Sequence, residues 1–219
     1  MYKVLITGGS GFIGTNLIEY YLKKNFTVLN LDIVPPKNNN HLKYWKNVDI
    51  TNFEDLESEM CNFDPEFIIH LAARTDLNGS TMIDYKANTT GVSNVAKGAS
   101  SCTNLKRIIF TSSMLVCKLG YTPKDENDFK PNTVYGESKV KSELIIREGQ
   151  LNYEWSIIRP TSIWGPWFGE PYRNFFDMIL SSRYFHIGNK SGKKTFGYVG
   201  NVIYQIDTIL FAEKDLIQN

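Results

Sequence analysis

The chain has 219 residues, of which 42% are hydrophobic and 21% are charged, and its formal net charge is +1. This balance is typical of a globular domain in water, and the near-neutral charge gives no reason to expect a nucleic acid or an anionic membrane as a partner. No apolar stretch approaches the length of a transmembrane helix, and three widely spaced cysteines without a CxxC pair predict reduced thiols, no metal site and a cytoplasmic location.

Short apolar runs alternate with helical patterns along the chain, which indicates a parallel sheet covered by helices on both faces. The strands are expected at residues 4–7, 28–33, 67–73, 107–111 and 155–159. The helices are expected at the apolar stripe after residue 12, from the capping-box sequence at Thr51 to about residue 62, and over residues 84–100, 135–149 and 201–213. This order of elements predicts a doubly wound α/β fold.

A glycine-rich turn joins the first predicted strand to the first predicted helix. Gly9, Gly11 and Gly14 have the G-x-G-x-x-G spacing that lets a backbone approach a pyrophosphate at the amino terminus of a helix. Asp32 lies at the end of the second strand, where a carboxylate can bind both hydroxyls of an adenosine ribose and repel a 2′-phosphate. The turn therefore predicts a dinucleotide site that favours NAD over NADP. A glycine-rich turn that binds no nucleotide is the alternative.

A tyrosine and a lysine lie one helical turn apart after the polar loop at residues 119–132. Tyr135 and Lys139 share one face of the predicted helix, so an ammonium group lies near a phenol whose pKa is otherwise about 10. A nearby positive charge lowers the pKa of a phenol and makes it a better proton carrier at neutral pH. Phenol acid–base chemistry beside a nicotinamide indicates hydride transfer at a carbinol or a carbonyl. The alternative is a half-buried tyrosine with a solvated surface lysine.

These motifs resemble, in their order, those of the extended short-chain dehydrogenase/reductase family, the NAD-dependent sugar-nucleotide epimerases and dehydratases. The resemblance extends over most of the chain. It rests on the segments at residues 7–14, 49–50, 70–73, 85–95, 110–116, 135–139, 159–160, 164–166 and 194–202. It implies an NAD-binding Rossmann domain at residues 1–165. At residues 166–219 it implies the start of a substrate-binding lobe, interleaved with a returning Rossmann element.

The resemblance also implies roles for the site residues. Tyr135 acts as general base toward a sugar hydroxyl or as general acid toward a keto oxygen. Lys139 lowers the pKa of Tyr135 and holds the nicotinamide ribose, and Ser113 hydrogen-bonds the reacting oxygen. Lys194 stands where relatives have an arginine that meets the substrate diphosphate. The implied NAD-binding positions are Gly8, Gly11, Phe12, Ile13, Gly14, Asp32, Ile33, Asp49, Ile50, Leu71, Ala72, Ala73, Asn88, Thr111, Tyr135, Lys139 and Pro160.

Two further features, besides Lys194, depart from the family pattern. Met114 and Leu115 stand where the 4,6-dehydratases carry an acidic pair, which disfavours dehydration of the sugar. The chain ends just after residues 201–213, where relatives continue into most of the substrate-binding lobe, so a partial, truncated lobe is expected. In a truncated lobe the apolar residues of the last helix are expected to be exposed. These residues are Ile203, Ile206, Ile209, Leu210 and Phe211.

The sequence therefore predicts an NAD-dependent epimerase of a nucleotide-activated sugar. One alternative is a reductase or dehydrogenase of a keto-sugar nucleotide or of another small carbonyl compound. A non-catalytic NAD-binding protein is the alternative from another class. The expected partners are the nucleotide-sugar substrate and a second copy of the chain, because family members often form dimers through helices equivalent to residues 84–100 and 135–149.

Overall fold

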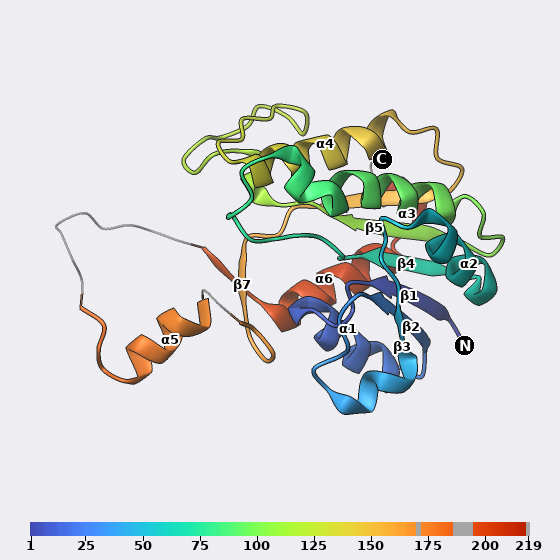
Figure 1. Cartoon of the computed structure of the whole chain (residues 1–219), viewed down its shortest axis with the longest axis horizontal. Helices are drawn as coiled ribbons and strands as arrows, with labels where there is room; N and C mark the ends of the chain where they lie inside the picture. The colour runs from blue at the N-terminus through green and yellow to red at the C-terminus, as the bar shows by residue number, and fades with distance from the viewer. Residues whose placement is uncertain (170–171, 186–194, 218–219) are drawn as a thin grey trace.

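A six-stranded parallel sheet forms the centre of the computed structural model, which describes residues 1–169, 172–185 and 195–217 (Figure 1). The order of the strands is β3-β2-β1-β4-β5-β6, and each neighbouring pair is parallel. The chain crosses over between β3 and β4, so the carboxyl ends of β1 and β4 form the topological switch point of the sheet. The strands are β1 (Lys3–Thr7), β2 (Thr27–Asp32), β3 (Trp45–Asn47), β4 (Phe67–His70), β5 (Arg107–Thr111) and β6 (Glu154–Ile158).

Helices cover both faces of this sheet (Figure 1). One face carries α1 (Phe12–Lys23) and α6 (Val199–Phe211), and the other carries α2 (Phe53–Phe63), α3 (Val92–Ala99) and α4 (Val134–Glu148). Because side chains alternate along a strand, Val4 and Ile6 of β1 pack in the core beneath α1, and Leu5 packs in the core beneath α3. The predicted doubly wound α/β fold is confirmed.

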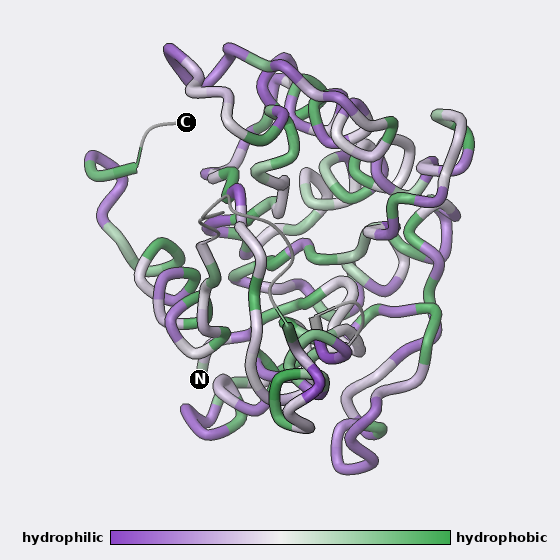
Figure 2. The backbone as a smooth tube through the Cα atoms, turned by 90° about the vertical axis from the view of Figure 1, so that its left-hand side faces the viewer, coloured by the Kyte–Doolittle hydropathy of each residue, from purple (hydrophilic) through white to green (hydrophobic). Residues whose placement is uncertain are grey.

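Shorter elements follow the sheet and its helices. A small parallel pair consists of β7 (Ser162–Trp164) and β8 (Phe196–Tyr198), and α5 (Tyr172–Leu180) lies apart from the central sheet in Figure 1. The 3₁₀ segments are Asn39–Tyr44, Met82–Tyr85, Met114–Val116 and Lys214–Leu216. Figure 2 shows long hydrophilic stretches in the outer turns at the top of the molecule. Within the described ranges no helix combines the length and the apolarity needed to cross a bilayer.

The strand predicted over residues 67–73 ends early, at His70. The backbone N–H of Leu71 donates to the Thr7 carbonyl at 3.0 Å, and the next N–H, of Ala72, points to the Thr7 hydroxyl at 3.4 Å. The chain therefore leaves the ladder at the end of β1 and runs along the glycine turn instead of continuing as a strand.

The amino terminus of α2 differs from the predicted capping box by one residue. Asn52 is the cap, and its Oδ1 accepts a hydrogen bond from the N–H of Asp55 at 3.4 Å. The Thr51 hydroxyl instead lies against the preceding loop, where it donates to Asp49 Oδ1 at 2.8 Å. Both residues are good caps, so the choice between them follows from where the preceding loop holds each side chain.

The last helix is largely buried, which corrects the expectation that its apolar residues are exposed. Ile203 is 6% exposed, and Ile206 and Leu210 are each 1% exposed, because α6 returns to the sheet and packs beside α1. Phe211 keeps 41% of its surface exposed at the end of the helix. Helix α6 thus completes one face of the sheet.

Candidate functional site

The glycine turn after β1 forms a cradle that side chains leave open. Gly8 has a φ of +72°, and a Cβ atom there would lie 2.6 Å from the backbone nitrogen of Ala72. A Cβ atom on Gly14 would lie 2.4 Å from the Cα atom of Gly9. Gly11 caps α1 with extended backbone and no side-chain hydrogen bond, so the first N–H groups of α1, from Phe12 onward, are left for a ligand. This donor set fits a pyrophosphate.

Asp32 lies beside this cradle at the end of β2. Its carboxylate accepts hydrogen bonds from the backbone N–H groups of Ser10 and Val34, each at 3.0 Å. Burial raises the pKa of Asp32, and these backbone hydrogen bonds act in the opposite direction. Ile33 follows with 62% of its surface exposed. The carboxylate therefore stands next to the turn, as a ribose-binding group requires.

The segment after β4 runs past the same turn. His70 is buried, and its Nδ1 lies 2.7 Å from the Thr7 hydroxyl. Burial lowers the pKa of His70 to about 3, and the charge of Lys139 adds to this effect, so the imidazole is neutral at physiological pH. Leu71, Ala72 and Ala73 continue as irregular backbone along the cradle.

The predicted adenine-binding pair lies at the start of α2. Ile50 is 5% exposed, and a Cβ atom on Gly91 would lie 2.5 Å from its Cδ1 atom, so the side chain packs tightly under the helix that carries Gly91. The carbonyl of Ile50 accepts a hydrogen bond from Asn94 at 3.0 Å. Asp49 binds the backbone and hydroxyl of Thr51, each at 2.8 Å.

Tyr135 enters the site from the first turn of α4. Thr133 caps this helix, because its hydroxyl accepts a hydrogen bond from the N–H of Gly136 at 3.0 Å. The Tyr135 side chain is 7% exposed, and its ring centroid lies 6.0 Å from that of Tyr85. Burial raises the pKa of the Tyr135 phenol, and a hydrogen bond with the side chain of Ser113 opposes this rise. The raised pKa differs from the expectation that Lys139 lowers it, because the cost of burying a phenolate dominates.

Lys139 reaches the carboxyl end of β5. Its Nζ atom donates to the carbonyl of Thr111 at 3.0 Å, and the residue is 3% exposed. Burial lowers the pKa of Lys139 to about 8, while the charge of Glu143 acts in the opposite direction. The ammonium is therefore the main form at neutral pH. Ser113 lies two residues after Thr111, and its Oγ accepts a hydrogen bond from the N–H of Leu115 at 3.1 Å.

Asn88 forms hydrogen bonds to two segments, the one at Arg74 and the helix α4 that carries Tyr135. Its Oδ1 accepts a bond from the N–H of Arg74 at 2.8 Å, and its Nδ2 donates to the Arg74 carbonyl at 3.0 Å and to Ser138 Oγ at 2.9 Å. The Ser138 hydroxyl then donates to the Tyr135 carbonyl at 2.7 Å. The Asn88 carbonyl also accepts a bond from the Ser142 hydroxyl. These bonds give Asn88 an internal, organising place beside the predicted cofactor path.

The same contacts explain why the helix predicted over residues 84–100 is interrupted. Asn88 lies in a π-helical turn, Ala87–Gly91, which precedes α3 and follows the 3₁₀ segment. Turns of this kind are frequent at functional sites. Sequence periodicity does not reveal them, since the pattern of buried residues is nearly that of an α-helix.

Two further predicted residues have different outcomes. The carbonyl of Pro160 accepts a hydrogen bond from the N–H of Met114 at 3.2 Å, which places Pro160 beside the segment that carries Ser113. Lys194 lies outside the described residues.

Sequence reasoning missed Glu143 and Arg159 as part of this site. The signal for Glu143 is its spacing, because it follows Lys139 by four residues, as Lys139 follows Tyr135.

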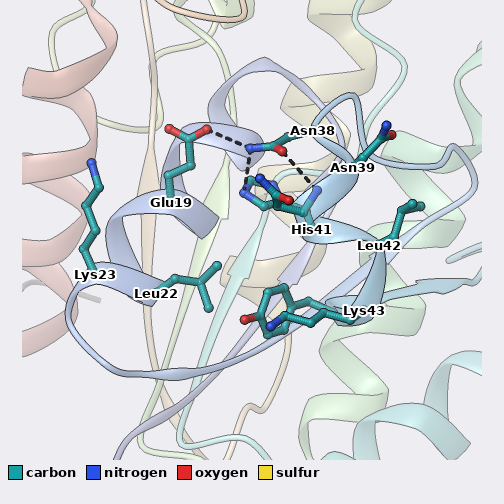
Figure 3. Close-up of a pocket in the computed structure, with 10 residues that line it drawn as sticks. Glu19, Leu22, Lys23, Asn38, Asn39, His41, Leu42 and Lys43 are labelled. Atoms are coloured by element: carbon teal, nitrogen blue, oxygen red, sulfur yellow. Dashed lines mark hydrogen bonds between the residues drawn. The ribbon is translucent and has the colours of Figure 1, made fainter.

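Two surface pockets flank the sheet. One of 660 Å³ lies between α1 and the 3₁₀ segment Asn39–Tyr44, with Glu19, Asn38 and His41 in its wall (Figure 3). None of the described predicted site residues lines it. The other, of 700 Å³, is largely apolar and borders the amino terminus of α1, where the rings of Phe12 and Phe168 lie 6.2 Å apart. Its lining consists of Trp164, Gly165, Pro166, Phe168 and Tyr198.

Fold and geometry together define a doubly wound α/β protein with a glycine cradle suited to a dinucleotide. The chain belongs to the NAD dependent epimerase/dehydratase family, whose model matches residues 4–215. This is the family that the sequence motifs resembled, and it makes NAD the cofactor of the fold.

Individual relatives differ in chemistry. A 3-beta-hydroxysteroid dehydrogenase of Mycolicibacterium neoaurum is 30% identical over 227 residues, which cover 96% of this chain and 61% of the relative. An N-acetyl-alpha-D-glucosaminyl-diphospho-ditrans,octacis-undecaprenol 4-epimerase of Escherichia coli O157:H7 is 30% identical over 208 residues, which cover 92% of this chain and 61% of the relative. The chain thus spans about three fifths of the length of these curated relatives.

The fold is also similar to solved structures. The NAD complex of the UDP-glucose 4-epimerase from Thermus thermophilus superposes with a TM-score of 0.80 at 21% identity. The match covers 96% of this chain and 75% of that chain. At this identity the similarity establishes the shared architecture, including the doubly wound sheet on which the glycine cradle lies.

Proposed function

We propose that the chain carries the cofactor-binding and catalytic part of an NAD-dependent epimerase, which acts on a nucleotide-activated sugar by transient hydride transfer. One observation carries the proposal: the phenol of Tyr135, the hydroxyl of Ser113 and the ammonium of Lys139 gather at the carboxyl end of β5. The side chain of Ser113 acts on the phenol of Tyr135 and opposes the rise of its pKa, and Lys139 donates to the carbonyl of Thr111 at 3.0 Å. Such a buried proton carrier beside a dinucleotide cradle suits oxidation at a carbinol.

Each of the three residues has a distinct task in this proposal. NAD, when bound, supplies the acceptor and donor of the hydride. Tyr135 removes the proton from the sugar hydroxyl and returns it to the keto oxygen. The Oγ of Ser113 accepts a bond from the N–H of Leu115, and its own hydrogen is the one that would be donated to the reacting oxygen. Lys139 holds a positive charge one helical turn from the phenol, which favours the phenolate when Tyr135 gives up its proton.

The proposed substrate is recognised by the region after residue 166. Residues 1–165 serve as the NAD-binding domain, and residues 166–219 contribute the start of the substrate-binding lobe. Lys194 is the proposed contact for the nucleotide diphosphate, as a point charge without the bidentate geometry of arginine. Met114 and Leu115 disfavour dehydration, because neither can act as an acid or a base. A homodimer through α3 and α4 is the proposed assembly.

A dehydrogenase of a small carbonyl compound is the second candidate. The apolar lining of the 700 Å³ pocket favours it, because aromatic walls suit a substrate with an extended apolar surface. The Mycolicibacterium relative is named as a dehydrogenase of a steroid, which is such a compound. Release of an oxidised product together with NADH distinguishes this activity from epimerisation, in which the cofactor returns to its starting state.

Substitution of Tyr135 by phenylalanine tests the proposal. The chain is incubated with NAD and a panel of UDP-, GDP- and dTDP-sugars, and the products are resolved by chromatography. Tyr135→Phe removes one hydroxyl group and is expected to keep NAD binding and lose at least about 100-fold in turnover, the usual contribution of a general acid or base. Tyr204→Phe is the matched control, because that side chain is 68% exposed on α6. Equal turnover in Tyr135→Phe and Tyr204→Phe would refute the role of the phenol.

A further inference from the structure

A buried carboxylate continues the row of site residues on α4. Glu143 follows Lys139 by four residues, so Tyr135, Lys139 and Glu143 lie one above another on the same face of the helix. Glu143 is 0% exposed. A carboxylate that is removed from water is costly to fold unless charged or polar partners surround it, so its surroundings indicate what it serves.

Arg159 holds both oxygens of this carboxylate. Its Nε donates to Glu143 Oε1 and its Nη2 to Oε2, each at 2.7 Å, which is the bidentate geometry of a strong ion pair. Arg159 is itself fixed, since Nη2 also donates to the Glu126 carbonyl at 2.5 Å and the guanidinium lies 5.2 Å from the centre of the Phe129 ring. Arg147 lies farther away, at 3.5 Å from Oε2. The charge of Glu143 therefore has a defined position relative to Lys139.

Glu143 supplies the negative charge near Lys139 in the described parts of the chain. His70 on β4 is neutral at physiological pH, and the β5 group that Lys139 binds is the uncharged carbonyl of Thr111. The titratable and charged groups around Lys139 and its helix face are Tyr135, Glu143 and Arg147 on α4, His70 on β4, Tyr85 beside Tyr135, and Arg159 after β6. Of these, the carboxylate is the group that opposes the effect of burial on Lys139.

We propose that Glu143 is a positioning residue, whose carboxylate keeps Lys139 protonated and whose own place is fixed by Arg159. The inference rests on the proposed function, in which the charge of Lys139 supports proton transfer at Tyr135. Without the carboxylate, Lys139 and Arg159 are two like charges in a site with little water. Lys139 then loses its proton at a lower pH, and the phenolate loses its nearby cation.

Titration of Lys139 itself tests this role. The chain is labelled with ¹³C at the lysine Cε atoms, and the resonance of Lys139 is assigned by its loss in Lys139→Arg. In the parent chain the titration midpoint is expected near pH 8. Glu143→Gln keeps the shape of the side chain, removes its charge, and is expected to lower the midpoint by about one pH unit or more, the size expected for unit charges about 6 Å apart in a buried site.

Glu137→Gln is the matched control for charge. It removes one carboxylate from the first turn of the same helix, but Glu137 is exposed, so the midpoint of Lys139 is expected to stay in place. Arg159→Gln provides a second test with the opposite sign. It removes the bidentate partner of Glu143, leaves Arg147 at 3.5 Å as the other guanidinium beside the carboxylate, and is expected to raise the midpoint. This variant decides the question if Glu143→Gln does not fold.

Two outcomes overturn the proposal: an unmoved midpoint in folded Glu143→Gln, or a lower or unchanged midpoint in Arg159→Gln. The measurement needs neither NAD nor a sugar, so it is separate from the test of the proposed function. Kinetics with a sugar that the chain converts give a further readout. Glu143→Gln is expected to move the high-pH limb of the kcat profile to lower pH by as much as it moves the Lys139 midpoint, and to leave KM for the sugar unchanged. A purely structural residue would lower activity equally at every pH.

Discussion

A buried arginine on β5 fastens the last described helix to the sheet. Arg107 is 4% exposed, and its Nη1 donates to the carbonyls of Ile209, Leu210 and Ala212 at 2.6, 3.1 and 2.8 Å. Its Nη2 forms an ion pair with Glu154 at 2.5 Å. Four carbonyls at the end of a helix lack partners within the helix, and a cation there also interacts favourably with the helix dipole.

Replacement of this arginine by methionine is expected to be severe. A hydrogen bond to a charged group contributes about 1.5–3 kcal/mol, and removal of one partner of a buried charged pair costs about 3–5 kcal/mol. Since the three bonds share one nitrogen and Glu154 is partly solvated, we expect Arg107→Met to lower the free energy of unfolding by about 3 kcal/mol. This corresponds to a fall in Tm of about 6–12 °C for a chain of this length.

Urea unfolding followed by circular dichroism measures this effect. Lys106→Met is the control, because Lys106 is the neighbouring residue and its ion pair with Glu66 lies on the surface, with the lysine side chain 57% exposed. Such a surface pair contributes about 1 kcal/mol at most. A loss in Arg107→Met that is no larger than the loss in Lys106→Met would refute the reasoning that Arg107 anchors α6.

Two further predictions concern the cofactor cradle and its buried histidine. Asp32→Ala is expected to weaken NAD and to reduce the preference for NAD over NADP by about tenfold, the effect of one charge-assisted hydrogen-bond pair. Calorimetry with both dinucleotides measures this, and an unchanged preference would contradict the assignment of Asp32. Burial lowers the pKa of His70 from 6.5 to about 3, so the unfolded chain binds a proton that the folded chain does not. Stability is therefore complete above pH 6.5 and falls as the pH is lowered, and between pH 7 and pH 5 the parent is expected to lose about 2 kcal/mol more than His70→Gln in urea unfolding. Equal losses would show that the imidazole takes up its proton without unfolding.

Much of the fold could be predicted from local sequence patterns, namely apolar runs and the residues that begin and end helices. The strand at residues 107–111 has the observed bounds of β5, because a continuous apolar run marks a strand that is buried on both faces. The helix that carries Tyr135 starts after Thr133 and ends before Gly149, a cap and a helix-ending residue that can be read directly from the sequence. By contrast, β3, β7 and β8 have three residues each, too few to show any alternation.

Contacts between distant residues account for what the sequence did not reveal. The sequence did not indicate that the last helix packs on the sheet, because Arg107, which hydrogen-bonds to the end of this helix, lies 102 residues before Ile209. The direction of the pKa shift of Tyr135 was also wrong, since the depth of its burial depends on how Tyr85 and Ser113 fold around it. Spacing on α4 placed Lys139 one turn from the phenol, but it could not show that Arg159 pairs with the next residue in that row.

Calorimetric titration with NAD, followed by a panel of UDP-, GDP- and dTDP-sugars, tests the central claim most directly. The glycine cradle and Asp32 predict that the 219-residue chain binds NAD and that one nucleotide-sugar adds its own heat to the NAD-loaded chain. A folded chain that releases no heat with NAD would contradict the account at its foundation. Binding of NAD without a response to any sugar would contradict the proposed substrate.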